Sequence, residues 1–165
     1  MTSAPDPNIG DRDGTDEEVD DQFRALLEGL RTTIPGVIVL FSFLLILPFQ
    51  SSFGELQGFN TVVFYTAFAT SALAAILMIA PAVHQRVRAP RAGIKRRTWS
   101  HVMFATKLGI AGTAAHVVSI TAVVYLVSSV VFTDWMAVIA TVVIALTVAW
   151  AWFYIPLVTF QKSED

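Results

Sequence analysis

The sequence predicts an all-α integral membrane four-helix bundle with a short N-terminal amphipathic helix and a disordered acidic N-terminal tail. Four long stretches contain no Asp, Glu, Lys or Arg, and they lie between Arg31 and Glu55, Glu55 and Arg86, Lys107 and Asp134, and Asp134 and Lys162. Each exceeds the roughly 20 residues with which a helix crosses a hydrocarbon core about 30 Å thick. Because 55% of the chain is hydrophobic, too little polar sequence remains to cover four such helices in water.

The N-terminal 31 residues are polar and acidic. Residues 1–14 are rich in Pro, Asp and Gly, so we expect a disordered tail there. Thr15 and Glu18 fit a capping box, which predicts a cytoplasmic amphipathic helix over residues 15–31. Its apolar residues recur at three- and four-residue spacing: Val19, Phe23, Leu26, Leu27 and Leu30. This helix either lies against the membrane or the cytoplasmic loop, or it extends directly into the first span.

The membrane domain is expected over residues 32–160. Its four predicted spans cover about 33–49, 61–83, 107–132 and 135–159. Proline fits the boundaries, because Pro35 falls in the first turn of span one, where a missing N–H breaks no hydrogen bond. Pro81 and Pro156 fall near the ends of spans two and four, where a helix can stop.

The distribution of positive charge predicts the orientation in the membrane. The segment between spans two and three carries most of the bases, namely Arg86, Arg88, Arg91, Lys95, Arg96 and Arg97. The loops at 50–60 and 133–134 contain no Lys or Arg. Since positive residues stay on the cytoplasmic side, both termini and the basic loop are expected in the cytoplasm. The basic loop either serves only as this topology signal or also binds anionic lipid headgroups.

One ionisable side chain lies well inside a predicted span. His116 shares a small, polar face of span three with Gly109, Gly112 and Ser119. Buried ionisable groups in membranes are expensive, so this histidine is a candidate for proton relay or ligand contact. The alternative is a neutral histidine that is hydrogen-bonded to a neighbouring helix, which we favour because no Asp or Glu lies within a span to pair with it.

Other chemistry has no candidate residues. The chain has no cysteine, which excludes disulfides and thiolate sites. Its three histidines, His84, His101 and His116, show no spacing typical of haem or zinc ligation. No nucleophile elbow, phosphate loop or paired-carboxylate motif occurs. We therefore expect no metal, no cofactor, no catalytic residue, no enzymatic activity and no nucleic-acid partner.

Several short motifs resemble a known family. They are Ile34-Pro35-Gly36, Pro48-Phe49-Gln50, Ala80-Pro81-Ala82 and Trp150-x-Trp152. The chain resembles, over most of residues 22–157, an uncharacterised family of small bacterial four-span membrane proteins, domain of unknown function 6328. The resemblance implies a multi-pass protein of the bacterial inner membrane. Some members carry cation or proton antiporter names, but this sequence lacks the intramembrane carboxylate that such exchange normally uses.

Two functions remain open. The first is an accessory or scaffold protein of the bilayer that works through helix packing with itself or with a larger membrane partner. The alternative is a small oligomeric transporter or channel of cation or proton type, with a path lined by His116. Small residues at four-residue spacing mark the helix contacts, with Ala67, Ser71 and Ala75 in span two, and Ala137, Thr141, Ala145 and Ala149 in span four. We expect these ridges to serve mainly packing within one chain.

Overall fold

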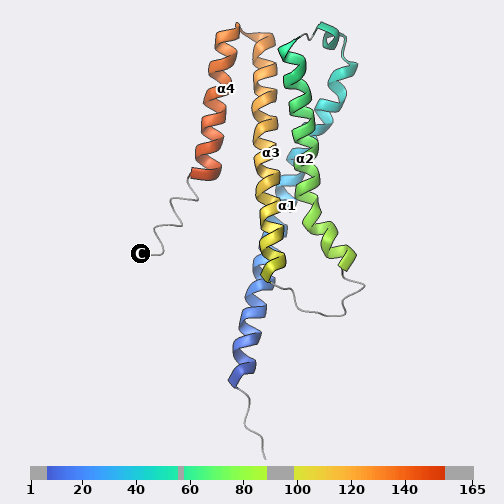
Figure 1. Ribbon diagram of the computed structural model, residues 1–165. Helices are drawn as coiled ribbons and strands as arrows, with labels where there is room; N and C mark the ends of the chain where they lie inside the picture. The colour runs from blue at the N-terminus through green and yellow to red at the C-terminus, as the bar shows by residue number, and fades with distance from the viewer. Residues whose placement is uncertain (1–6, 56–57, 89–98, 155–165) are drawn as a thin grey trace, which may run out of the picture.

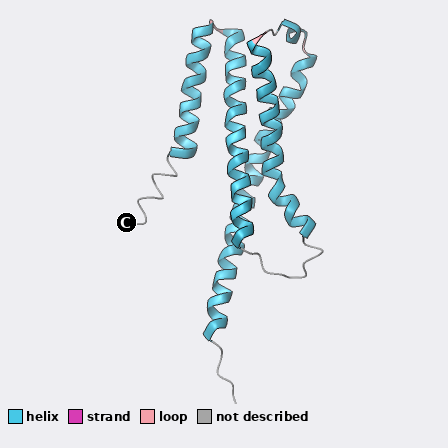
Figure 2. Cartoon of the chain, viewed as in Figure 1, coloured by secondary structure: helices cyan, strands magenta, loops and turns pink. Residues whose placement is uncertain are grey.

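The computed structural model describes residues 7–55, 58–88 and 99–154, and every regular element among them is helical (Figures 1 and 2). The elements are α1 (Pro7–Ile46), two short 3-10 turns, η1 (Leu47–Phe49) and η2 (Ser51–Glu55), then α2 (Phe59–Arg88), α3 (Trp99–Val131), α4 (Asp134–Ala149) and a π-helical turn, η3 (Trp150–Tyr154). The all-α prediction is confirmed.

Four segments are long and apolar enough to cross a bilayer. They are Glu18–Phe49, Phe59–Val87, Ser100–Val131 and Asp134–Trp152. Each contains or overlaps one of the four predicted spans, so the chain is a multi-pass membrane protein. The last part of the fourth predicted span, residues 155–159, lies outside the described residues.

α1 differs from the prediction at its start. It begins at Pro7, so residues 7–14, which we expected in the disordered tail, are helical, while residues 1–6 lie outside the described part. Proline is well suited to a first helical position because its missing N–H would have no partner there. The helix then continues without interruption through Thr15 into the first span. Of the two arrangements left open for residues 15–31, the structure has the direct extension.

α1, α2 and α3 share the apolar core, which forms three layers along the helices. One end layer contains Phe23, Val102 and Ala105. The middle layer contains Leu30, Val37, Ala74, Met78 and Ala115. The other end layer contains Leu44, Phe64, Ala67 and Leu126. α1 contributes residues to all three layers. Figure 1 shows that it crosses behind the antiparallel pair of α2 and α3.

α4 lies outside this core. Among the described elements it contacts only α3 and its own continuation η3, at the edge of the molecule (Figure 1). Its one buried residue is Ala137. The two residues between α3 and α4, Phe132 and Thr133, force α4 to return beside α3. The four predicted helices are therefore present, but they are arranged as a three-helix core with one helix attached.

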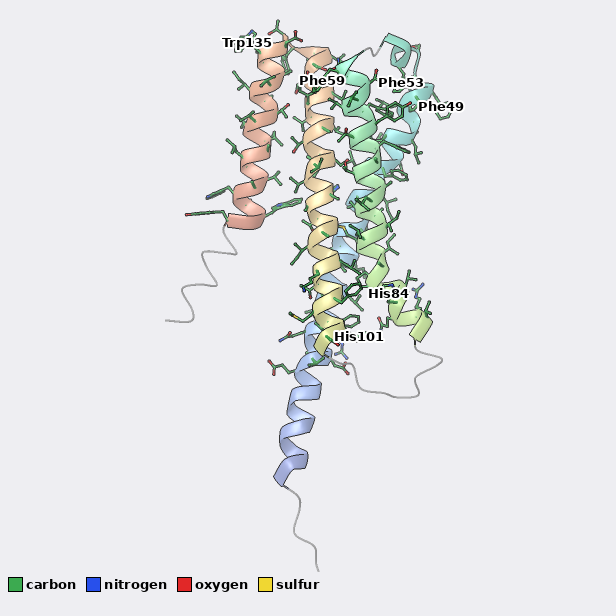
Figure 3. All side chains as sticks on the ribbon, viewed as in Figure 1. Phe49, Phe53, Phe59, His84, His101 and Trp135 are labelled. Atoms are coloured by element: carbon green, nitrogen blue, oxygen red, sulfur yellow. The ribbon has the colours of Figure 1, made fainter. Side chains whose placement is uncertain are left out.

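The two ends of the bundle have different side chains. Phe49, Phe53, Phe59 and Trp135 lie at the end where α1 meets α2 and α3 meets α4 (Figure 3). Three of them are largely exposed, as expected for aromatic rings at a membrane boundary. His84 and His101 lie at the opposite end (Figure 3). There α2 bends away from α3, and Pro81 accounts for the bend because it removes a hydrogen bond inside the helix.

Candidate functional site

The structure brings the predicted polar face of α3 into the bundle. Gly109, Gly112, His116 and Ser119 are all buried. Gly109 faces α1, since a Cβ built there would lie 3.8 Å from Leu30 Cδ2. Gly112 and Ser119 face α2. This face of α3 is therefore covered by two other helices of the same chain.

Gly112 marks the closest approach of α2 and α3. A Cβ built on Gly112 would lie 2.8 Å from Met78 Cγ and 3.3 Å from both the Ala74 carbonyl oxygen and Leu77 Cβ. Any larger residue would push the two helices apart. Small residues at helix contacts allow this approach, because van der Waals packing drives helix association in lipid.

Ser119 supplies the polar link between the same two helices. Its Oγ donates a hydrogen bond of 2.9 Å to the carbonyl oxygen of Ala67, and both residues are fully buried. Ser71, one turn further along α2, is also fully buried. The span-two ridge is thus used at Ala67 and Ser71 for packing inside the chain, and Ala137 plays the same part in α4.

His116 lies where α4 ends. Only 8% of its surface is exposed, and its Nδ1 has no hydrogen-bond partner among the described residues. The imidazole ring centre is 6.5 Å from that of Trp152, with the two planes 19° apart. Trp152 belongs to the π-helical turn η3, an irregularity that often occurs at functional positions. The expected hydrogen bond from His116 to a neighbouring helix is therefore not seen at Nδ1.

The position of His116 along α3 agrees with the expectation that it lies well inside a span. The candidate span of α3 runs from Ser100 to Val131, and His116 falls at its middle. His101 is fifteen residues away on the same helix, about 22 Å along its axis. The contact between His116 and Trp152 therefore forms within the bundle and not at the end that holds His84 and His101.

Ser71 is the residue that sequence reasoning missed. We had assigned it only to a ridge of small residues, yet its Oγ is buried and has no hydrogen-bond partner among the described residues. A serine in a helix normally bonds to the carbonyl one turn earlier. For Ser71 that carbonyl belongs to Ala67, which already accepts the Ser119 hydroxyl. Its position beside the polar face of α3 could be inferred only from the pairing of the helices.

The basic segment lies mostly outside the described residues. Arg86 is exposed near the end of α2, and Arg88 is the last residue of that helix. Arg91, Lys95, Arg96 and Arg97 fall in the segment that is not described, so the structure does not address their contacts with lipid.

The histidines do not form a joint site. His84 stacks on Phe104 with ring centres 6.2 Å apart, and His101 lies at the same end of the bundle (Figure 3). His116 contacts Trp152 instead. Over the described ranges, no three His, Asp or Glu side chains are close enough to hold a metal ion. What the polar face does within the described chain is to hold α2, α3 and the end of α4 together.

Comparisons with known proteins give one positive result. No curated protein and no solved structure matches the chain. A family model, described as a family of unknown function (DUF6328), matches residues 12–156. This match covers most of the chain and includes all four candidate spans as far as Trp152. The protein therefore belongs to the DUF6328 family.

Proposed function

We propose that this protein is an accessory or scaffold component of the bacterial inner membrane, and that it associates with a second copy or a larger membrane protein through α4. The observation that carries the proposal is that α4 has a single helical partner, α3, in the described chain. Its other sides present large apolar residues: Trp135, Met136, Val138, Ile139, Val142, Val143 and Leu146. A helix with one helical neighbour has most of its surface available to another protein.

The closed polar face supports association over transport. Met78 of α2 occupies the space beside Gly112, and the Ser119 hydroxyl donates its hydrogen bond to the carbonyl oxygen of Ala67. A transport path needs polar groups that face a water-filled space, whereas these groups face neighbouring helices. The small residues of α3 therefore act in packing, as expected for a protein whose activity consists of helix contacts.

Orientation and location belong to the same proposal. Arg86 and Arg88 end α2 at the side of the bundle where α3 begins, and the remaining bases follow them in the sequence. The positive-inside rule assigns this end, with both termini, to the cytoplasm. We further propose that the protein is not an enzyme and has no nucleic-acid partner, because no constellation for either role was found in its sequence.

Cross-linking can test the proposed surface directly. The chain has no cysteine, so each introduced cysteine is unique. Val143→Cys places the thiol on the open side of α4, where Val143 is 55% exposed. Ala137→Cys is the matched control, because Ala137 is fully buried against α3. In native membranes, Val143→Cys should give one adduct of defined mass, while Ala137→Cys should give none.

Two cross-linking results would contradict association through α4. If Val143→Cys and its neighbours around α4 all stay uncross-linked at native expression levels, α4 faces only lipid and the proposal fails. A smear of many masses that is equal for every position would also contradict it, because random collisions do not depend on the side of the helix.

A second candidate, the small cation or proton transporter, rests on one observation. Nδ1 of His116 is buried without a hydrogen-bond partner among the described residues, as a group that exchanges protons or ligands would be. The test is ion flux into proteoliposomes that contain a pH-sensitive dye, with Na⁺ or K⁺ gradients imposed. Flux that is lost in His116→Ala would favour transport, whereas a flat trace from folded wild-type protein would favour the accessory function.

A further inference from the structure

Two buried polar atoms of the described chain lack a hydrogen-bond partner, and they are the only such side-chain atoms in its described part. They are Oγ of Ser71 on α2 and Nδ1 of His116 on α3. Ser71 is fully buried and His116 is 92% buried, as its 8% exposure implies. Buried polar groups in proteins are almost always paired, either with protein or with ordered water. Two exceptions in one small membrane protein call for a common explanation.

The pairing of α2 with α3 places both residues at the same level. Ser119 is bonded to Ala67, and Gly112 lies against Ala74, which fixes the register of this antiparallel pair. Ser71 lies four residues after Ala67 along α2. Because α3 runs in the opposite direction, the residue at the same level is Ala115, which lies four residues before Ser119 and next to His116. The two side chains therefore differ by no more than one residue in height.

Helix geometry also places them on the same side of the interface. At about 100° per residue, Ser71 is turned about 40° around α2 from Ala67. By the same measure, His116 is turned about 60° around α3 from Ser119. Because the helices are antiparallel, both turns lead to one side. Gly109, which contacts α1, lies on this side of α3 as well, so α1 lies on the side towards which both residues turn.

We propose that Ser71 and His116 form an internal hydration site between α2 and α3, which binds one water molecule. The water donates a hydrogen bond to Nδ1 of His116 and accepts one from the hydroxyl of Ser71. Each orphaned atom then has a partner, and the water has the minimum of two that a buried water requires. The consequence for His116 is a neutral ring with its proton on Nε2.

Trp152 completes the site. Its indole lies over the imidazole on the side from which α4 approaches, with ring centres 6.5 Å apart. Apolar cover of this kind keeps the water from exchanging into the bilayer and binds the end of α4 to the polar pair. The site is thus local and closed, which separates it from a continuous transport path. It is also independent of the association proposed for α4.

Ser71→Ala should shift the detergent-unfolding midpoint in opposite directions for a hydrated site and for a dry site. In a dry site, Ser71→Ala removes an unpaired buried hydroxyl and should raise the detergent-unfolding midpoint. In a hydrated site, the same change removes a partner of the water and should lower the midpoint. Ser42→Ala is the control, because the exposed Ser42 bonds only to Ile38 of its own helix and its loss should leave the midpoint unchanged.

A double-mutant cycle and NMR locate the water. Ser71→Ala and His116→Phe combined should lower the midpoint by less than the two single shifts added, because either change alone already disrupts the site. In wild-type protein in bilayers, ring ¹⁵N spectra should show an unprotonated Nδ1 at His116 with magnetisation transfer from water. A protonated Nδ1, a lack of transfer from water, or a midpoint raised or unchanged by Ser71→Ala would overturn the proposal.

Discussion

At the scale of single residues, each member of the polar face of α3 has a different physical task. Gly112 provides space, Ser119 provides a hydrogen bond, and His116 provides a contact for Trp152. The first of these tasks is the most restrictive, because a backbone oxygen and two side chains surround the missing Cβ.

Gly112→Ala should therefore destabilise the protein by about 1–3 kcal/mol, the usual effect of overpacking a core. The new methyl group would lie 2.8 Å from Met78 Cγ and 3.3 Å from the Ala74 carbonyl oxygen, so α2 must shift. Gly36→Ala is the control, since beyond its chain neighbours and the adjacent turns of its own helix backbone nothing lies within 4 Å of its added Cβ. It should be neutral or stabilising by up to about 1 kcal/mol. Detergent titration monitored by circular dichroism measures both, and equal midpoints would contradict the assigned helix contact.

The sequence identified part of this face. Spacing of three and four residues was enough to group Gly109, Gly112, His116 and Ser119, because a helical period determines which residues share a side. Ser71 could not be assigned to the site in this way. Its relevance depends on the register between α2 and α3, which Ser119 and Ala67 set through space and not through sequence spacing.

At the scale of elements, the attachment of α4 is the feature with the clearest consequences. α4 contacts α3 alone, and at its end the ring of Trp152 reaches His116. Trp150, two residues earlier in the same π-helical turn, is 58% exposed and does not have this contact. The two tryptophans thus form a matched pair in which only one side chain covers the buried histidine.

Trp152→Ala should expose His116 and make its modification by diethylpyrocarbonate several-fold faster, roughly in proportion to the area that the indole covers. Trp150→Ala should leave the rate unchanged. Mass spectrometry of the histidine-containing peptides measures the rates, and the exposed His101 provides an internal reference. If both variants react like the wild type, Trp152 is not the cover of His116.

The four spans could be predicted from the sequence, whereas the start of α1 and its continuity into the first span could not. Four charge-free stretches were sufficient for four helices, because the bilayer demands uninterrupted apolar length. The start of α1 at Pro7 was missed because the acidic, Pro- and Gly-containing residues 7–14 resemble a disordered segment by composition. The continuity through residues 15–31 follows from the helix already present on both sides.

At the scale of the whole molecule, the charge distribution predicts a fixed orientation. Gly54 lies in the connection between α1 and α2, and Gln85 lies near the opposite end of α2, both exposed. In intact cells, a membrane-impermeant maleimide should label Gly54→Cys but not Gln85→Cys, and permeabilised cells should show both labels. The expected reason is that basic residues are retained inside. The reverse pattern would invert the assigned topology.

The sequence did not predict that α1, α2 and α3 share the core while α4 lies outside it. All four spans have similar apolar character, and nothing in their composition distinguishes a helix that shares a core from one that lies at its edge. The distinction arises from the two-residue link before α4 and from α1, which crosses behind both α2 and α3 and supplies all layers of the core.

Association through α4 can be tested by the particle mass of the protein after extraction from native membranes into polymer nanodiscs with its own lipids. One chain has a mass of 18.0 kDa. If α4 binds a partner, the protein mass should be well above this value, either a multiple of it or its sum with one defined partner. It should return to the single-chain mass when the exposed Val143 of α4 is replaced by Arg. A protein mass of one chain in the wild type, with no partner present, would contradict the claim that α4 is an association surface.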